Sequence, residues 1–286
     1  MRPLQESHIT VVGLGLMGGS LAGALRPHCR SVTGVARRPE TLDIAHERRL
    51  IDRGTLALAD GLRRADIVIL ATPVRTILEQ LREIGPLLPA GCLVTDLGST
   101  KAQVADAMAL LPEHVHAIGG HPLCGRENAG IEAADPTLYE GQTFVLTPLA
   151  RTSAQAAELA RAIVGAVGAR PLLLDPRRHD RLVALTSHLP YLVACCLVES
   201  AAATAAIDPL LWDVRASGFR DTTRLAASDV TMMRDILLTN QEAVVEALAM
   251  CASQLGCLTS LIDAGDEDGL VATLTSIQTR RRELYG

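Results

Sequence analysis

Gly13-Leu14-Gly15-Leu16-Met17-Gly18 follows a β-branched run, residues 8–12, and precedes residues 19–25, which have the composition of a helix. A G-x-G-x-x-G run between a strand and a helix is far more specific than the glycines alone. The first glycine would form the tight turn, the second would let backbone approach a pyrophosphate, and the third would let helix and strand pack closely. The N–H groups at the helix start would then face the phosphates. A purely structural glycine turn is the weaker alternative, so we expect a dinucleotide site containing Gly13, Gly15, Leu16, Met17 and Gly18.

The sequence after the second predicted strand, residues 31–35, bears on which dinucleotide is bound. NAD-binding folds usually place an acidic residue there to bond the ribose 2′-hydroxyl. This chain instead has Ala36, Arg37 and Arg38, and its next acid is Glu40. Guanidinium groups bind phosphate oxygens bidentately, which suits a 2′-phosphate. The pattern favours NADP; the alternative is that one arginine stacks on adenine while NAD is still accepted.

Strand-like and helix-like segments alternate up to residue 175. We expect further strands at 67–71, 93–96, 115–118, 143–146 and 170–174, and helices at 40–50, 76–84, 101–110 and 153–168. Such alternation predicts a mainly parallel sheet covered by helices on both faces, an α/β fold of Rossmann-like, doubly wound type. Beyond Pro176 only helical patterns remain. We therefore predict a dinucleotide-binding domain at 1–175 and an all-α domain at 176–286.

Apolar residues in the second predicted domain recur in steps of four and three, which is typical of a narrow helix-packing seam. We call these positions the seam: Val244, Leu248, Cys251, Leu255, Leu258 and Ile262. The seam could pack within the chain, or it could form the interface of a homodimer, which is the favoured interpretation.

Composition excludes several classes of function. The hydrophobic content is 48% and the charged content 21%, as in ordinary globular proteins. A net charge of −5 and an aromatic content of 2% argue against a nucleic-acid partner. The seven cysteines form no C-x-x-C pair, which argues against a metal site and fits a reducing cytoplasm. The apolar segment that contains the glycine run is explained by the dinucleotide fingerprint, and no charge-free run of 18 residues is present elsewhere, so we expect no membrane partner.

Reactive side chains follow three of the predicted strands. Ligands of open α/β sheets bind beyond the carboxyl ends of the strands. Thr72 and Pro73 follow one strand and would lie beside the cofactor. Residues 96–101 follow another and include Ser99 and Lys101, the only lysine among 27 Lys and Arg residues. His121 follows a third, and an imidazole with an ordinary pKa of about 6.5 is a suitable general base.

Several longer motifs extend over nearly the whole chain. They are Asp96-Leu97-Gly98-Ser99-Thr100-Lys101, His121-Pro122-Leu123-Cys124-Gly125-Arg126-Glu127, His179-Asp180, Ser187-His188-Leu189-Pro190, Gly218-Phe219-Arg220-Asp221-Thr222-Thr223-Arg224-Leu225-Ala226, Ser228-Asp229 and Met233-Arg234-Asp235-Ile236. In this order they resemble the prephenate and arogenate dehydrogenases. The resemblance implies an N-terminal nucleotide-binding domain, a helical dimerisation domain, a small-molecule substrate and oxidative decarboxylation in tyrosine biosynthesis.

The resemblance also implies roles for individual residues. His121 would accept the proton of the substrate's C4 hydroxyl, and Ser99 would hydrogen-bond at the same place. Arg224 would bind a substrate carboxylate, and His188 would line or brace the pocket. Arg126 and Glu127 would lie near the substrate side chain or gate entry.

Two positions depart from the family pattern. Tyr191 stands where the family often has a second histidine, and Met233 stands where it often has a tryptophan. Both would belong to the substrate pocket, so the choice between the keto acid prephenate and the amino acid arogenate stays open.

Two other functions compete with this interpretation. β-Hydroxyacid dehydrogenases share a similar glycine run but use a catalytic lysine after the nucleotide domain, and residues 160–240 contain no lysine. A non-catalytic NADP sensor or scaffold would not require Ser99, His121, His188 and Arg224 together.

Overall fold

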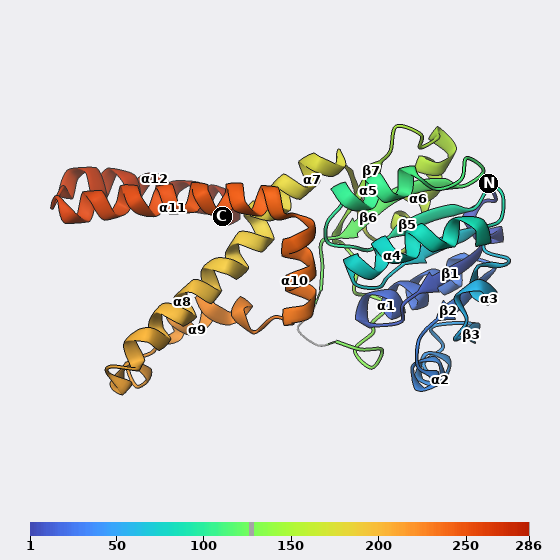
Figure 1. Cartoon of the computed structure of the whole chain (residues 1–286), viewed down its shortest axis with the longest axis horizontal. Helices are drawn as coiled ribbons and strands as arrows, with labels where there is room; N and C mark the ends of the chain where they lie inside the picture. Colours follow the sequence, from blue (N-terminus) through green and yellow to red (C-terminus); the bar gives the residue numbers. More distant parts are fainter. Residues whose placement is uncertain (126–128, 286) are drawn as a thin grey trace. The chain divides into compact units, whose positions relative to one another are not determined.

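Eight strands form one twisted sheet with helices on both faces (Figure 1). The computed structural model describes residues 1–125 and 129–285. The strand order is β3-β2-β1-β4-β5-β6-β7-β8, and every neighbouring pair is parallel except β6 and β7. The strands are β1 (His8–Val12), β2 (Ser31–Val35), β3 (Arg53–Thr55), β4 (Ile67–Leu70), β5 (Leu93–Asp96), β6 (His116–Pro122), β7 (Thr143–Pro148) and β8 (Arg170–Leu173). The predicted α/β fold, mainly parallel and Rossmann-like, is confirmed.

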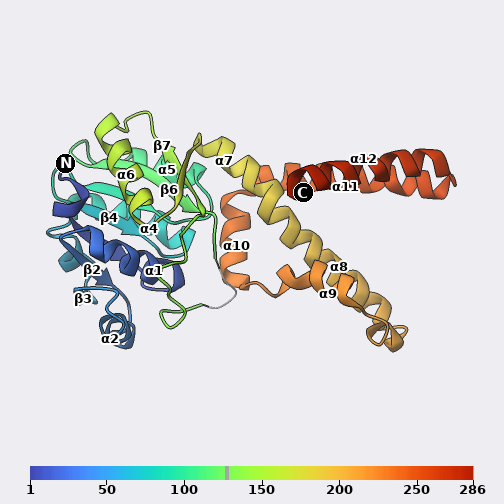
Figure 2. The same cartoon turned by 180° about the vertical axis from the view of Figure 1, so that it is seen from behind.

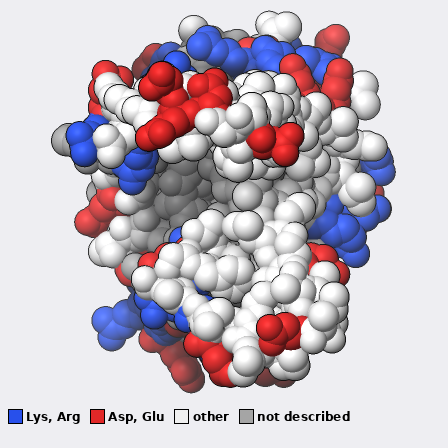
Figure 3. Space-filling model, turned by 90° about the vertical axis from the view of Figure 1, so that its left-hand side faces the viewer, with Lys and Arg blue, Asp and Glu red and all other residues white. Residues whose placement is uncertain are grey.

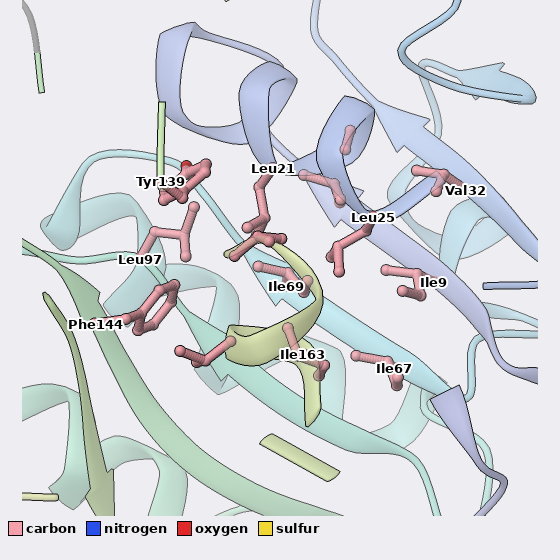
Figure 4. Close-up of a cluster of buried hydrophobic side chains, with 14 of the residues drawn as sticks. Ile9, Leu21, Leu25, Val32, Ile67, Ile69, Leu97, Tyr139, Phe144 and Ile163 are labelled. Carbon is pink, nitrogen blue, oxygen red and sulfur yellow. The ribbon is translucent and has the colours of Figure 1, made fainter. Parts of the chain in front are cut away.

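Two apolar cores cover the two faces of this sheet. One core packs α1 and α6 against the strands, and Leu21, Ile69 and Ile163 lie at its centre (Figure 4). The other core packs α3, α4 and α5 on the opposite face. The helices of this region are α1 (Leu16–Leu25), α2 (Pro39–Glu47), α3 (Leu58–Leu62), α4 (Val74–Ile84), α5 (Ala102–Ala109) and α6 (Ala154–Ala166). Because β4 is buried on both faces, its sequence is a continuous apolar run rather than an alternating pattern. The strand β5 is buried throughout as well, but it ends with the polar residues Thr95 and Asp96.

Three details of the sheet were not predicted. The strand β3 and the helix α3 are short and lack a clear apolar period, so no element was expected at residues 53–62. The strands β6 and β7 are antiparallel, because β7 runs back beside β6 without a crossover helix. The helix α1 begins at Leu16, within the glycine run, so Gly18 lies in its first turn.

A long, nearly continuous helix follows β8. It begins as α7 (Pro176–Val183), passes through one π-helical turn (Ala184–His188) and continues as α8 (Leu189–Ala205) (Figure 2). The helices α9 (Ser217–Thr223) and α10 (Val230–Thr239) follow. The α8 helix packs against the 3₁₀ turn Arg224–Ala227, and α10 packs against α4. These helices therefore belong to the same compact unit as the sheet, Met1–Asn240.

The second compact unit is Gln241–Gly286, in which α11 (Gln241–Asp263) and α12 (Glu267–Tyr285) pack against each other. Much of the apolar surface of this pair is exposed. Of the seam residues, Leu255 is 59% exposed and Ile262 is 66% exposed. Two helices, Pro176–Ala205 and Gln241–Asp263, meet the length and hydropathy of a membrane span by composition alone. Their apolar surface is the feature that any account of partners must explain.

Candidate active site

The glycine run forms an open cradle at the point where the strand order reverses, between β1 and β4. Gly13 has a φ of 97°, and a side chain there would meet the backbone oxygen of Ala71 at 2.8 Å. A Cβ on Gly18 would lie 1.9 Å from the oxygen of Gly13, so only glycine lets α1 approach the turn this closely. Among the described residues nothing lies within 4 Å of a Cβ on Gly15. This space, with the start of α1 behind it, fits a pyrophosphate.

The neighbouring strand ends complete this edge. Arg37 and Arg38 follow β2 and are exposed, whereas Ala36 is buried and its N–H donates to the oxygen of Thr55. Thr72 and Pro73 connect β4 to α4, and the Thr72 hydroxyl donates to Oε1 of Gln80. Leu16 is buried and Met17 half-buried in the first turn of α1. The cofactor residues chosen from the sequence thus lie in the first turn of α1 and in the connections that follow β1, β2 and β4, at the carboxyl ends of these strands.

His121 lies near the carboxyl end of β6, where two glycines permit close packing. A Cβ on Gly120 would lie 2.5 Å from the oxygen of Asp96, and one on Gly119 would lie 2.2 Å from Oγ1 of Thr147. The imidazole of His121 hydrogen-bonds through Nδ1 to Nε2 of His179, at 2.8 Å. The strand thus holds His121 against the first turns of α7.

His179 and Asp180 are buried on the face of α7 that meets the sheet region. The helix begins at the N-cap Asp175, whose carboxylate accepts from the N–H of Arg178. Nδ1 of His179 lies 2.8 Å from Oδ1 of Asp180. The Asp180 carboxylate also accepts from the N–H of Lys101 at 2.7 Å and of Ala102 at 2.8 Å. One carboxylate therefore holds both the start of α5 and the histidine behind His121.

Lys101 forms a buried ion pair with Asp96, and neither side chain has exposed surface. The Asp96 carboxylate also accepts from the N–H of Gly98 at 2.8 Å and of Gly120 at 3.0 Å. Burial lowers the pKa of Lys101, and the charge of Asp96 opposes that shift. Because Asp96 bonds to the loop before Lys101 and to the strand of His121, the ion pair fixes both.

His188, in the π-helical turn, is 1% exposed and is held by Asn240 at the end of α10. The amide nitrogen of Asn240 donates to the oxygen of Asp180 at 2.8 Å and to Nδ1 of His188 at 3.2 Å. An amide nitrogen can only donate, so Nδ1 of His188 accepts and its proton is on Nε2. His188 thus presents a donor on the side away from Asn240.

Both histidines of the predicted site have lowered pKa values. The pKa of His121 lies well below its ordinary value, first because of burial and then because of His179, Lys101 and His188. The pKa of His188 is lowered to about 4, mainly by burial. Both imidazoles are therefore neutral near pH 7, the state that a general base requires.

The other predicted site residues lie on the loop before α5 and on the helices. Ser99 is half-buried after β5, and no hydrogen bond joins it to His121 within the part of the chain that the structure describes. Arg224 begins the 3₁₀ turn packed on α8, the helix that carries the half-buried Tyr191. Met233 is buried on α10. Arg126 and Glu127 lie outside the described residues.

The packing of α10 against α4 brings Met233's helix to the cofactor edge. Asp235, 4% exposed, lies 2.7 Å from Arg234 on its own helix and 3.8 Å from Arg75 in the first turn of α4.

Among residues 1–125 and 129–285, no three His, Cys, Asp or Glu side chains gather in a way that could hold a metal ion.

Sequence reasoning gave no role to four residues of this network: His179, Asp180, Lys101 and Asn240. The pairs Lys101–Asp96 and His179–Asp180 are local, but the other contacts of these residues span 52 to 79 residues of sequence, and no local pattern indicates those contacts. Two signals were present in the sequence. Lys101 is the only lysine, and Asp175-Pro176 marks the start of a helix that must bury His179 and Asp180.

Comparisons with known proteins agree with this arrangement. The family model described as prephenate dehydrogenase, nucleotide-binding domain, matches residues 21–173, and the one described as prephenate dehydrogenase, dimerization domain, matches residues 175–276. The chain is 34% identical to a cyclohexadienyl dehydrogenase of Zymomonas mobilis over 97% of this chain and 96% of that protein.

Two solved structures share the whole fold. The prephenate dehydrogenase of Aquifex aeolicus, in complex with hydroxyphenyl propionate and NAD⁺, has a TM-score of 0.91 and 33% identity, over 99% of this chain and 100% of that chain. The arogenate dehydrogenase of Synechocystis has a TM-score of 0.86 and 32% identity, over 97% and 99%. With its glycine cradle, its buried histidines and both family domains, the chain belongs to the prephenate and arogenate dehydrogenase family.

Proposed function

We propose that the chain oxidatively decarboxylates prephenate, arogenate or both, giving 4-hydroxyphenylpyruvate or tyrosine. The observation that carries this proposal is His121, a neutral imidazole held at the end of β6 beside a dinucleotide cradle. The bound nicotinamide would supply the acceptor for the hydride that leaves C4 of the substrate ring. Loss of the ring carboxylate as CO₂ then makes the ring aromatic, which drives the reaction.

The residues of the chain would bind the substrate and move one proton. His121 accepts the proton of the C4 hydroxyl, a contribution of about 10²–10⁴-fold to the rate. Ser99 hydrogen-bonds to the same hydroxyl, and Arg224 holds a carboxylate in the reactive pose. His188 carries its proton on Nε2, because Nδ1 accepts from Asn240, and would offer that proton to an acceptor on the substrate.

The substrate side chain would be read by Tyr191 and Met233, together with Arg126 and Glu127. A carboxylate such as Glu127 suits the ammonium of arogenate, whereas a guanidinium such as Arg126 suits the carboxylate of either substrate. We infer a single pocket that accepts the cyclohexadiene ring and selects between the two side chains through these four residues.

NADP is the proposed cofactor, with NAD as a second possibility. Two exposed guanidiniums after β2 stand where NAD-binding folds usually have a carboxylate for the ribose. The variant Arg37→Ala/Arg38→Ala should weaken NADP binding much more than NAD binding, as measured by fluorescence titration of the reduced cofactors. Equal losses for both cofactors would contradict the preference.

A homodimer in the cytoplasm is the proposed state of the protein. The dimerization-domain match covers the seam, and uncharged residues cover much of the face seen in Figure 3. All seven cysteines are unpaired, as expected for a reducing compartment. Self-association accounts for the exposed apolar helices without a membrane or nucleic-acid partner.

The experiment measures reduced nicotinamide formed from prephenate and from arogenate, each with NADP and with NAD. His121→Asn should keep cofactor binding and lose about 10²–10⁴-fold in kcat. His116→Gln is the matched control, because it changes a half-buried histidine at the other end of the same strand. No turnover with any pair of substrates, while NADP still binds, would favour a sensor; full turnover of His121→Asn would remove His121 as the base.

A further inference from the structure

A second histidine lies directly behind the proposed base. His179 has no exposed surface, and its two ring nitrogens contact His121 on one side and Asp180 on the other, each at 2.8 Å. The two histidines are 58 residues apart in the sequence, on β6 and α7. The proposed function as stated so far gives this buried imidazole no role.

The direction of each hydrogen bond follows from Asp180. Its carboxylate accepts from the N–H of Lys101 and of Ala102. An ionised carboxylate can only accept, so Nδ1 of His179 carries the proton that lies between them. In the neutral ring Nε2 then carries no proton, so it must accept a hydrogen bond from the N–H at Nδ1 of His121. Nε2 of His121 is left with a free lone pair.

We propose that His179, oriented by Asp180, is a positioning residue that fixes the base tautomer of His121 and takes up positive charge from it during the reaction. This proposal rests on the proposed function, in which His121 is the base. When the substrate O–H bond breaks, an N–H bond forms at Nε2 of His121. The proton on Nδ1 of His121 then moves to Nε2 of His179, so the charge comes to lie on His179 beside Asp180.

No electrons pass between His121, His179 and Asp180, and each transferred proton returns to the atom that it left. Oxidation and decarboxylation first form the product as a phenolate, which is still bound in the site. Its oxygen takes the proton back from Nε2 of His121, and the proton on Nε2 of His179 returns to Nδ1 of His121. The base is thereby restored to its starting tautomer without exchange with solvent.

The surroundings of His121 favour movement of the positive charge from His121 to His179. Burial first, and then His179, Lys101 and His188, lower the pKa of His121 and so disfavour an imidazolium there. Asp96, the last residue of β5, is paired with Lys101. His179 instead touches the carboxylate of Asp180. A positive charge is therefore better placed on His179 than on His121.

Two substitutions separate the two parts of the role. In His179→Gln the amide oxygen can still accept from Nδ1 of His121 but cannot take a proton. In His179→Ala nothing at that position accepts. His116→Gln is again the matched control. The readouts are the ¹⁵N chemical shifts of the imidazoles in the protein without cofactor or substrate, kcat, and the acid limb of kcat/KM.

In the wild type we expect the His121 proton on Nδ1. His179→Gln should keep this tautomer and lose an intermediate part of kcat. His179→Ala should lose the single tautomer and up to about 10⁴-fold in kcat, the loss that a wrong tautomer causes in a serine protease. Its acid limb should move to lower pH, because the charge of the proton that His121 binds can no longer pass to a second imidazole beside Asp180. A purely structural role would leave the tautomer and the acid limb unchanged.

A His121 proton on Nε2 in the wild type would overturn the proposal. So would wild-type kcat and an unchanged acid limb in both His179 variants while His121→Asn is inactive. If His121→Asn is itself active, the proposed function has failed instead, so the two failures are distinguishable. The wild-type ¹⁵N measurement decides the tautomer even if His179→Ala does not fold.

Discussion

The sheet region, residues 1–173, and the helix pair α11–α12 differ in how much of their apolar surface they bury themselves. Strand residues such as Ile67 and Leu93 have no exposed surface. In the helix pair, Leu255 is 59% exposed, Ile262 66% and Leu274 49%. The sheet region is stabilised by its own cores, whereas the helix pair presents an apolar surface of the kind that marks a protein interface. Changes in the two regions should therefore be measured by different experiments.

The largest effect on stability is expected inside the sheet region, from Lys101→Met. The substitution leaves Asp96 ionised and buried without its partner, which costs about 3–5 kcal/mol. The free energy of unfolding in urea measures the loss. The variant Lys101→Met/Asp96→Asn should recover part of it, because no unpaired charge remains. A single variant as stable as the wild type would show that the ion pair does not hold this edge together.

In the helix pair, Leu255→Glu should weaken self-association and leave the sheet region intact. Burying a leucine side chain contributes about 1.5–3 kcal/mol, and each protomer of a dimer would lose that contribution. Analytical ultracentrifugation across a concentration series measures the change. Ser253→Glu, an exposed position off the seam on the same helix, is the control. Equal dissociation of both variants would contradict an interface along the seam.

Histidine titration on mild acidification should affect Met1–Asn240, because residues 241–286 contain no histidine. The folded-state pKa of His188 is lowered to about 4, below its ordinary value, so on acidification the unfolded chain binds the proton first. The contribution of neutral His188 to the free energy of unfolding is fully present above its ordinary pKa of about 6.5 and is lost as pH falls toward 4. Between pH 6.5 and 5 the loss is about 2 kcal/mol.

Urea unfolding at pH 7 and pH 5 measures this loss, and His188→Gln should make stability less dependent on pH. His121, whose pKa is also lowered, acts in the same direction and would account for the slope that remains. An unchanged slope in His188→Gln would mean that another group carries the effect.

The smallest effects are expected at two helix caps. Ser153 caps α6 on the sheet, and Asp175 caps α7, which carries His179. Replacing either by alanine should cost about 1 kcal/mol of stability. Only Asp175→Ala should also lower kcat, because the first turn of α7 positions His179. Matching losses of kcat in both variants would show that the cap of α7 has no special connection to the site.

The fold was predictable where chemistry and local pattern coincide. The glycine run, the strand before it and the continuous apolar run of β4 need no information from distant residues. The short strand β3 and the direction of β7 depend on tertiary pairing, which no local period reveals. His121 was identifiable as a base because glycines and a proline surround it at the end of a strand.

The network behind His121 was not predictable in the same way. His179 looks like one more polar residue among the arginines at the start of α7, and only the fold brings it to β6. Asn240 likewise ends one helix and bonds a histidine in another. The sequence thus indicates which groups face the substrate, whereas the groups that orient them depend on the packing of α7 and α10 against the sheet.

The π-helical turn Ala184–His188 sets the relation between His179 and His188. In a regular α-helix nine residues make about two and a half turns, which would put these two histidines on opposite sides. A turn closed by i→i+5 bonds accommodates one more residue and rotates all that follows it. Both imidazoles are buried in this chain, at 0% and 1% exposure. The one residue that the π-helical turn adds therefore decides whether His179 and His188 lie on the same side of the helix or on opposite sides.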